Sequence, residues 1–388
     1  MNKYLETLGD GQIWDLRGIL PEAKQKTFED LFSGRALARM AQEVNRCSPE
    51  ARVLFTPFKE KGKITGLSVT KALLSHNKKA KKIAIILLKD LAKNAGLGIK
   101  ALNEGKGFKP HWSTKERNYW KNLDVIFIGG GVSEGLTGKI LAASIKRFLS
   151  QDNLSEIRVY QAKFPGKEAG FLGAVINIFK IICREGKARG LKEIAAIGLD
   201  LGREKIGVGL LTIKPNTGRI ILKQRGKPRF FQHSLKTPCQ RYRRIFLDSR
   251  RDYARRERIR GKQIRELILS QMANLIILAQ AQAKRFGWET ARHIGVAVPG
   301  RVSTDGYIAD STDYLPFFRR RDGFHFARSL EESLVKRGLS DYQVHLVNDG
   351  IAAGIANAYF DSLKASDGKF AFLGAGSGLG GCVGRVKT

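Results

Sequence analysis

The sequence has few acidic residues for its size. Asp and Glu number 36 against 69 Lys and Arg, which gives a formal net charge of +33 and a pI near 10.2. This imbalance predicts attraction to polyanions such as nucleic acid, polyphosphate or acidic lipid surfaces. A specific nucleic-acid reader also needs an element that enters a groove or stacks on bases. No such element is evident, and a generally basic soluble protein is the alternative.

Cysteine clusters and long apolar runs are also missing. The four cysteines lie far apart, with no Cys-x-x-Cys pair and no histidine beside them, so neither a disulfide framework nor a zinc site is indicated and no zinc is expected. No apolar segment approaches the roughly 20 residues of a membrane helix, so no membrane span is expected. Residues 1–17 are too polar for a signal peptide, and we therefore expect a cytoplasmic protein.

The chain does have enough apolar residues for a large core. With 388 residues, of which 43% are hydrophobic, it is long enough for two domains. Apolar periodicity predicts helices within 27–44, 69–97, 139–149, 169–182 and 264–286, and short apolar runs predict strands at 157–162 and 344–347.

One stretch organises the second half, the segment IGLDLGREKIGVGLL at 197–211. It predicts two antiparallel strands, with Asp200 at the end of the first strand and Gly202 in the bend. A carboxylate beside a turn of exposed backbone N–H groups can hold a metal and the phosphates that it neutralises. A second strand, turn and strand, FAFLGAGSGLGGCVGRV, spans 370–386 and turns within 376–381.

Two other strand ends carry candidate site residues. The run LDVIFIGGG ends in three glycines at 129–131, which let a flat ligand approach the backbone closely. The strand at 344–347 ends in Asn348 and Asp349, at the start of a predicted helix. Asp349 is placed to accept the proton of an attacking hydroxyl, or simply to cap that helix, and Asn348 to hold a neighbouring hydroxyl. Two phosphate-facing turns with an acid between them favour phosphoryl transfer.

The segment 223–262 is a basic insertion with 15 Lys and Arg against three acidic residues. Five aromatic residues are interleaved with these charges, which is the composition a single-strand nucleic-acid binder would use. The alternative is a solvated insertion whose aromatic side chains pack inward. The aromatic residues are Phe230, Phe231, Tyr242, Phe246 and Tyr253.

Four motifs, GLDLGREKI, GVAVPG, VNDGIAAGIA and GSGLGGCV, together resemble in order and spacing those of the ROK sugar kinases (repressor, open reading frame, kinase) of the actin, hexokinase and Hsp70 ATPase superfamily. The resemblance implies an α/β fold of two ribonuclease H-like lobes. It also implies ATP-dependent phosphorylation of a hydroxyl on a hexose or amino sugar, with Mg²⁺. Asp349 would be the general base, Asn348 and Gly300 would contact the sugar, and Asp200 would lie near Mg²⁺, directly or indirectly.

The same resemblance assigns ATP phosphates to glycine-rich turns. The remaining family motifs, however, lie before the first hairpin rather than after the second. FEDLFSGRAL at 28–37 resembles the sugar-binding segment and supplies Glu29, IGGGVSEG at 128–135 resembles the nucleotide loop, and AGFLGAVI at 169–176 resembles the terminal helix. The expected nucleotide-binding residues are Asp200, Gly202, Lys205, Gly129, Gly130, Gly131, Gly376, Ser377, Gly378 and Gly380.

The complete motif set therefore occurs once, in rotated order, and we infer a circular permutation. Residues 185–192 would join the family's usual ends, and Met1 and Thr388 should lie close together in space. The expected division is a larger lobe at 1–185, a linker at 186–192, a smaller lobe at 193–367 with the basic insertion 223–262, and the first hairpin of the larger lobe at 368–388.

Several family features are replaced or missing. Arg203 and Glu204 stand where the family has Gly-Thr, and neither its Glu-x-Gly-His element nor its zinc-binding cysteine cluster has a counterpart. Two alternatives to an ATP-dependent kinase therefore stay open. One is a non-catalytic sugar or nucleotide sensor that could bind nucleic acid through the basic insertion, and the other is a sugar kinase that uses polyphosphate. Because family members are commonly dimers, a homodimer is a further expectation.

Overall fold

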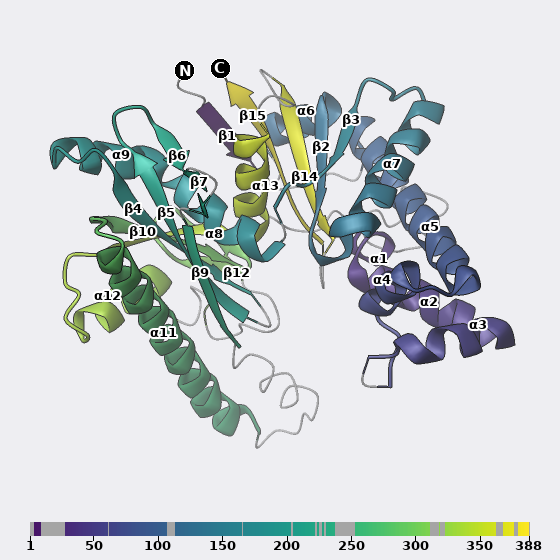
Figure 1. Cartoon of the computed structure of the whole chain (residues 1–388), viewed down its shortest axis with the longest axis horizontal. Coiled ribbons are helices and arrows are strands. Elements are labelled where there is room, and N and C mark those ends of the chain that lie inside the picture. The colour runs from purple at the N-terminus through teal and green to yellow at the C-terminus, as the bar shows by residue number, and fades with distance from the viewer. Residues whose placement is uncertain are drawn as a thin grey trace. The chain divides into compact units, whose positions relative to one another are not determined.

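The structure is a computed structural model that describes most of the chain. The described residues are 4–8, 28–60, 62–106, 113–164, 166–202, 205–221, 223–224, 227–228, 230–236, 253–310, 318, 323–361, 368–375 and 379–387. They form two compact units, unit 1 with Met1–Gly166 and Asn357–Thr388, and unit 2 with Lys167–Ala356 (Figure 1). Both units combine helices with mixed sheets, so the expected α/β class is confirmed.

Unit 2 is built on a sheet with the strand order β13-β10-β4-β5-β6. β4 (Ile194–Leu201) and β5 (Lys205–Lys214) form the antiparallel hairpin that the sequence predicts. β10 (Thr290–Val298) and β13 (Gln343–Asn348) run parallel to β4. β6 (Arg219–Ile221) and β9 (Phe230–Lys236) pair antiparallel with successive parts of β5, so the basic insertion contributes a strand.

The two faces of this sheet are covered differently. On one face, the side chains of β4, β5 and β10 share a hydrophobic core with α11 (Tyr253–Arg285) and α12 (Phe326–Val335). On the other face lies α8 (Gly166–Asn177), whose backbone approaches the strands closely. A Cβ at Gly198 or Gly295 would overlap the carbonyl oxygen of Phe171 or Ala174 on α8. Glycine at these strand positions therefore sets how closely α8 packs.

Smaller elements complete unit 2. The helix expected over 169–182 is divided at Ile178, because α8 ends at Asn177 and α9 (Phe179–Ala188) follows. α13 (Asp349–Phe360) begins directly after β13 and its end belongs to unit 1. The short strands are β7 (Lys223–Gln224), β8 (Lys227–Pro228), β11 (Arg301–Val302) and β12 (Ile308–Asp310).

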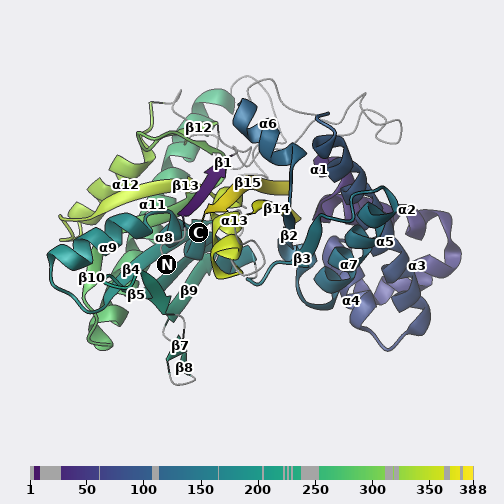
Figure 2. The ribbon, with the colours of Figure 1, turned by 90° about the horizontal axis from the view of Figure 1, so that it is seen from above.

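Unit 1 contains a sheet with the order β1-β15-β14-β2-β3. β14 (Lys369–Ala375) and β15 (Leu379–Lys387) form the second predicted hairpin. β2 (Val125–Gly129) and β3 (Arg158–Gln161) run parallel to β14. β1 (Tyr4–Leu8) pairs antiparallel with β15, and Tyr4 lies opposite Lys387 (Figures 1 and 2). The described residues nearest the two chain ends are therefore neighbours, as predicted, while Met1 and Thr388 themselves lie outside the described residues.

The two sheets share one topology when unit 1 is read from β14 through β15 to β1. Each has a central antiparallel hairpin, β4-β5 or β14-β15. The second hairpin strand pairs antiparallel with an outer strand, β6 or β1, and the first strand is followed on its other side by two parallel strands. In this reading β1, the first strand of the chain, takes the place in unit 1 that β6 takes in unit 2.

Helices and sheet of unit 1 share a second hydrophobic core. Ser33 caps α2 by accepting a hydrogen bond from the N–H of Ala36, and Asn77 caps α5 by accepting one from the N–H of Ala80.

Among the described residues, no helix has the length and hydrophobicity that a membrane span requires. The helices are α1 (Phe28–Leu31), α2 (Gly34–Cys47), α3 (Pro49–Phe55), η2 (Thr56–Phe58), α4 (Gly66–Leu74), α5 (Lys78–Asn103), α6 (Thr114–Lys121), η3 (Gly131–Ser133) and α7 (Gly135–Gln151).

The boundaries between the two compact units differ from the domain boundaries expected from the sequence. The chain leaves unit 1 after Gly166 and returns at Asn357, whereas the motifs place the boundaries at 185–193 and 367–368. The difference arises because α8 packs against the unit 2 sheet, as the close approach at Gly198 shows. The expected linker at 186–192 includes the last turn of α9.

Joining the two chain ends and opening the chain after α9 should give a folded protein. Because Tyr4 and Lys387 are paired neighbours, joining the chain ends through a hairpin loop of about two to five residues requires little movement. New ends opened between Gly190 and Leu191 lie in the turn after α9. We expect this permutant to melt cooperatively and to protect the β1 and β15 amides, as measured by circular dichroism and hydrogen exchange. An unfolded product would contradict the observed pairing of the ends.

Candidate functional site

The candidate site in unit 2 is formed where three parallel strands end. Asp200 is the penultimate residue of β4 and lies in register with Ala297 of β10. The next residue of β10, Val298, lies in register with Asn348, the last residue of β13. The pairing through β10 thus brings Asp200 and Asn348 to the same edge of the sheet, although they are far apart in sequence. Carboxyl ends of parallel strands are a common place for ligand sites.

Asn348 is fixed by hydrogen bonds at both ends of its amide. Its side chain is buried, its Nδ2 donates to the carbonyl of Gly300 over 2.9 Å, and its Oδ1 accepts from the N–H of Ile351 over 3.0 Å. Gly300 has a φ of +98°, a conformation that favours glycine. Asn348 therefore caps α13 and ties β13 to the turn after β10.

Asp349 is the first residue of α13 and is partly buried. Its Oδ1 accepts a hydrogen bond from the N–H of Gly350 over 2.8 Å. Burial raises the pKa of Asp349 to about 6, although hydrogen bonds from the Gly350 backbone, its own backbone and Asn348 oppose that increase. The N–H of Ile351, the third residue of α13, donates its capping hydrogen bond to Oδ1 of Asn348. The helix therefore does not need Asp349 as its cap.

Asp200 and Asp349 are close enough to influence each other. Burial, and after it the negative charge of Asp349, together raise the pKa of Asp200 to about 8. No described Lys, Arg or His forms an ion pair with either carboxylate. Two neighbouring, partly buried carboxylates without a cationic side chain suit a divalent cation, which prefers oxygen ligands.

A further residue at this site was not among the sequence predictions. Gly170 of α8 lies against Asp200, so that a Cβ at this position would overlap the Asp200 carboxylate. Gly173, one turn later, lies against the backbone of Ala352 in α13 in the same way. Both glycines lie in the segment AGFLGAVI at 169–176. The sequence of that segment does not show that Gly170 contacts Asp200, because the contact depends on how α8 packs.

Glycines of three neighbouring strands lie side by side at one end of the unit 1 sheet. Gly129 of β2 lies in register with Gly374 of β14, which pairs across the hairpin with Gly380 of β15. Gly130 has a φ of +85°, and a Cβ there would overlap the backbone of Ala375. The turn at Gly129, Gly130 and Gly131 therefore begins beside the end of β14.

The start of α7 lies next to this glycine turn and has unused polar groups. Its N-cap residue, Glu134, makes no capping hydrogen bond through its side chain. The hydroxyls of Ser133 and Thr137 are buried and have no hydrogen-bond partner among the described residues. Gln161 at the end of β3 donates from Nε2 to the carbonyl of Ser133 over 2.9 Å. Uncapped helical N–H groups beside a glycine turn form a favourable environment for an anion.

The remaining predicted site residues are described only in part. The N–H of Gly202 donates to the carbonyl of Lys205 over 2.9 Å, which closes the bend between β4 and β5, and Lys205 is exposed. Glu29 lies in α1, but its side chain is outside the described part of the chain. Also outside the described residues are Arg203, Glu204, Gly376, Ser377 and Gly378.

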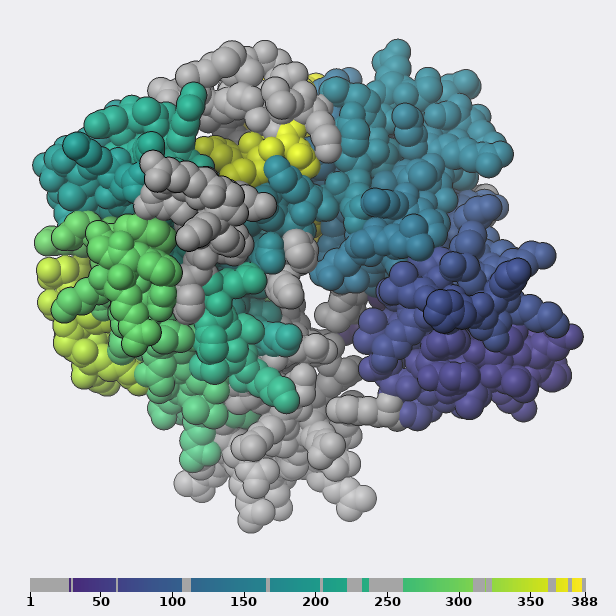
Figure 3. Space-filling view, viewed as in Figure 1, coloured from purple at the N-terminus to yellow at the C-terminus, as the bar shows by residue number. Residues whose placement is uncertain are grey.

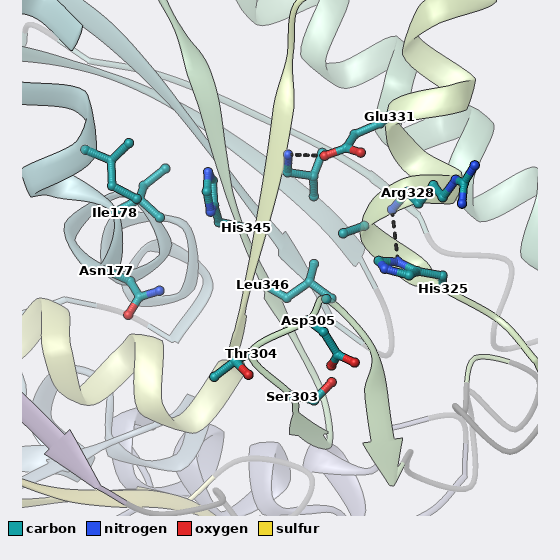
Figure 4. Close-up of a pocket in the computed structure, with 14 residues that line it drawn as sticks. Asn177, Ile178, Ser303, Thr304, Asp305, His325, Arg328, Glu331, His345 and Leu346 are labelled. Carbon is teal, nitrogen blue, oxygen red and sulfur yellow. Dashed lines mark hydrogen bonds between the residues drawn. The ribbon is translucent and has the colours of Figure 1, made fainter. Parts of the chain in front are cut away.

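A cavity of about 630 Å³ lies in unit 2 along the edge strand β13, and neither Asp200 nor Asp349 lines it. Figure 4 shows Asn177 and His345 on one side of it and the α12 residues Arg328 and Glu331 on the other. Glu331 accepts a hydrogen bond from the N–H of Val344 over 2.8 Å, so it occupies part of the open edge of β13. The acid pair and this cavity are separate features.

Replacing Asp200 by Asn should stabilise the protein at alkaline pH when no divalent cation is present. Because the pKa of Asp200 is raised to about 8 in the folded state, the folded protein binds more protons than the unfolded chain above about pH 4, and its stability falls as the pH rises to about 8. Asparagine does not ionise, so the variant does not lose stability in this way as the pH rises. At about 1.4 kcal/mol per pKa unit, we expect a gain of several kcal/mol at about pH 8.5 and little gain near pH 4, measured by urea unfolding.

The matched control for this change is Glu156→Gln, which removes one exposed carboxylate from unit 1. It should not show the same pH-dependent gain. A stability difference for Asp200→Asn that does not vary with pH would contradict the proposed burial of charge at Asp200.

Comparisons with known proteins do not assign a family to this chain. No protein-family model matches the sequence, and a search of curated proteins finds no significant match. The function is therefore argued from the site.

Proposed function

We propose that the protein transfers a phosphoryl group from ATP to a hydroxyl of a hexose or amino sugar, as a permuted ROK-like kinase. The observation that carries the proposal is the pair of adjacent carboxylates, Asp200 and Asp349, at the strand ends of unit 2. Phosphoryl transfer depends mainly on positioning and on neutralising charge. A sugar hydroxyl also needs a group that accepts its proton.

The topology supports the proposed fold and the rotated order. Two sheets with an antiparallel hairpin, an outer antiparallel strand and two parallel strands are what two ribonuclease H-like lobes would contain. In unit 1 this order is continuous only from β14 through β15 to β1. A break between the second and third strands of a lobe is what the proposed permutation requires, with the new ends at Lys387 and Tyr4.

Asp349 is the proposed general base. With a pKa of about 6 it is mostly ionised at neutral pH, yet it is a stronger base than an ordinary aspartate. Asn348 holds the start of α13 in place and uses one Nδ2 hydrogen for Gly300. In our proposal the second Nδ2 hydrogen and the backbone at Gly300 contact the sugar.

Asp200 is the residue that would hold Mg²⁺, directly or through water, with Asp349 beside it. When bound, the metal would neutralise phosphate charge. The turn closed by Gly202 and Lys205 would lie along the ATP phosphates. Within unit 1, the turn at 129–131 and the uncapped start of α7 offer backbone N–H groups to an anion.

Phosphate transfer to a panel of hexoses and N-acetylhexosamines tests the proposal. We expect the wild type to phosphorylate one sugar, and Asp349→Asn to lower kcat by about 100- to 10,000-fold, the usual contribution of a general base. Binding of a fluorescent ATP analogue should persist in the variant. Asp341→Asn, an exposed change of the same kind in unit 2, should behave like wild type.

The panel is run with ATP and with polyphosphate as donor. Unchanged turnover in Asp349→Asn would remove the base assignment, and transfer from polyphosphate alone would replace the donor. If the folded protein transfers phosphate to no sugar but binds one, the sensor alternative replaces the kinase.

The pH profile provides an independent test of Asp349. Because the base must be ionised, kcat/KM should fall about tenfold per pH unit on the acid side of its pKa. That pKa is about 6 without metal, and a bound divalent cation would shift the descent to lower pH. The measurement is kcat/KM from about pH 4.5 to about pH 8 at two Mg²⁺ concentrations. A flat profile would show that Asp349 does not act as the base.

A further inference from the structure

One face of α5 carries a concentration of lysines that the fold does not neutralise. α5 contains seven lysines and a single acidic residue, Asp90. Six of the lysines, all but Lys81, lie within an arc of about 100° around the helix, at 3.6 residues per turn. Lys100 is partly buried and ion-paired, whereas the other five are exposed and form no ion pair with a described residue. We name these residues the lysine face: Lys78, Lys79, Lys82, Lys89 and Lys93.

The position of these lysines is electrostatically unfavourable within the chain itself. Lys78, Lys79 and Lys82 lie in the first two turns of α5, where the helix dipole repels positive charge, and the first turn contains no acidic residue. Lys78 and Lys82, like Lys89 and Lys93, are four residues apart and repel each other across one turn. By contrast, Lys100 near the end of α5 pairs with Asp152 over 3.2 Å. An anionic partner would relieve the repulsion on the lysine face.

The shape of this surface fits an extended anion. Lys78 to Lys93 span about 22 Å along a straight helix, at about 1.5 Å per residue. In the space-filling view, residues 28–103 form a contiguous blue to purple part of the unit 1 surface (Figure 3). The opposite side of α5 is anchored in the core through buried residues such as Leu88 and Leu91. The lysine face is therefore presented on a rigid element.

We propose that the lysine face binds the phosphate backbone of double-stranded nucleic acid, without reading its sequence. Lysines supply charge to phosphates but no aromatic platform for stacked bases. A lipid surface is disfavoured because an interfacial helix inserts an apolar face. The apolar side of α5 is buried, and Ile86 is its only exposed large hydrophobic residue among those described. This binding is distinct from the sugar site and from the basic insertion 223–262.

The salt dependence of binding measures the number of phosphate contacts directly. The protein is titrated against a fluorescent DNA duplex of about 20 base pairs and arbitrary sequence, from about 50 to 250 mM KCl, and binding is followed by anisotropy. The slope of log K against log salt is negative, and each lost phosphate contact makes it less steep by about 0.9. The variant Lys78→Gln/Lys82→Gln/Lys89→Gln/Lys93→Gln should therefore reduce the magnitude of the slope by about 3 to 4.

The matched control removes four exposed lysines from unit 2, as Lys192→Gln/Lys214→Gln/Lys284→Gln/Lys336→Gln. It lowers the net charge by the same amount and should change the slope by less than about 1. Contacts of the basic insertion are present in both variants and cancel in the comparison. The double variant Lys89→Gln/Lys93→Gln should give about half of the full change.

Circular dichroism establishes that each variant is folded, and glutamine is a good helix former. Equal slopes for the two four-lysine variants would overturn the proposal, because binding would then depend on net charge alone. It would equally be overturned if the wild type bound phosphatidylserine vesicles but no duplex, or if the four-lysine variant of α5 retained the wild-type slope.

Discussion

The burial of two neighbouring carboxyl groups is the constraint on which the candidate site depends. Asp200 and Asp349 come from different strand ends, and the packing of β4, β10 and β13 holds them near each other. A protein interior normally separates like charges or neutralises them. Here Gly170 lets α8 approach Asp200, and Asn348 fixes the start of α13. The surrounding fold therefore maintains an arrangement that is unfavourable by itself and favourable for binding a cation.

Local features of the site could be predicted from sequence because they depend on neighbouring residues. The β4-β5 hairpin follows from two apolar runs around Gly202, and the Asn348-Asp349 pair follows from a strand that leads into a helix. In each case the side-chain pattern and the turn residue lie within one short segment.

Features that depend on distant contacts could not be predicted in this way. The proximity of Asp200 to Asp349 is set by the register of β10 between them, and the contact of Gly170 with Asp200 by the packing of α8. The start of unit 2 at Lys167 depends on the same packing of α8. The rotated motif order did predict that the chain ends lie together, because it implied a neighbouring strand for each end.

The strand pairing in unit 1 also has a consequence for the order of events on the ribosome. Unit 2 is one continuous stretch, and all strands of its main sheet have been synthesised by residue 348. The strands β1, β2 and β3 leave the ribosome much earlier, but β14 and β15, which lie between β1 and β2, are made last. During translation the first part of the chain must therefore remain without its central strands while a later part completes its own sheet. Unit 2 thus has its complete sequence while the unit 1 sheet still lacks its central strands.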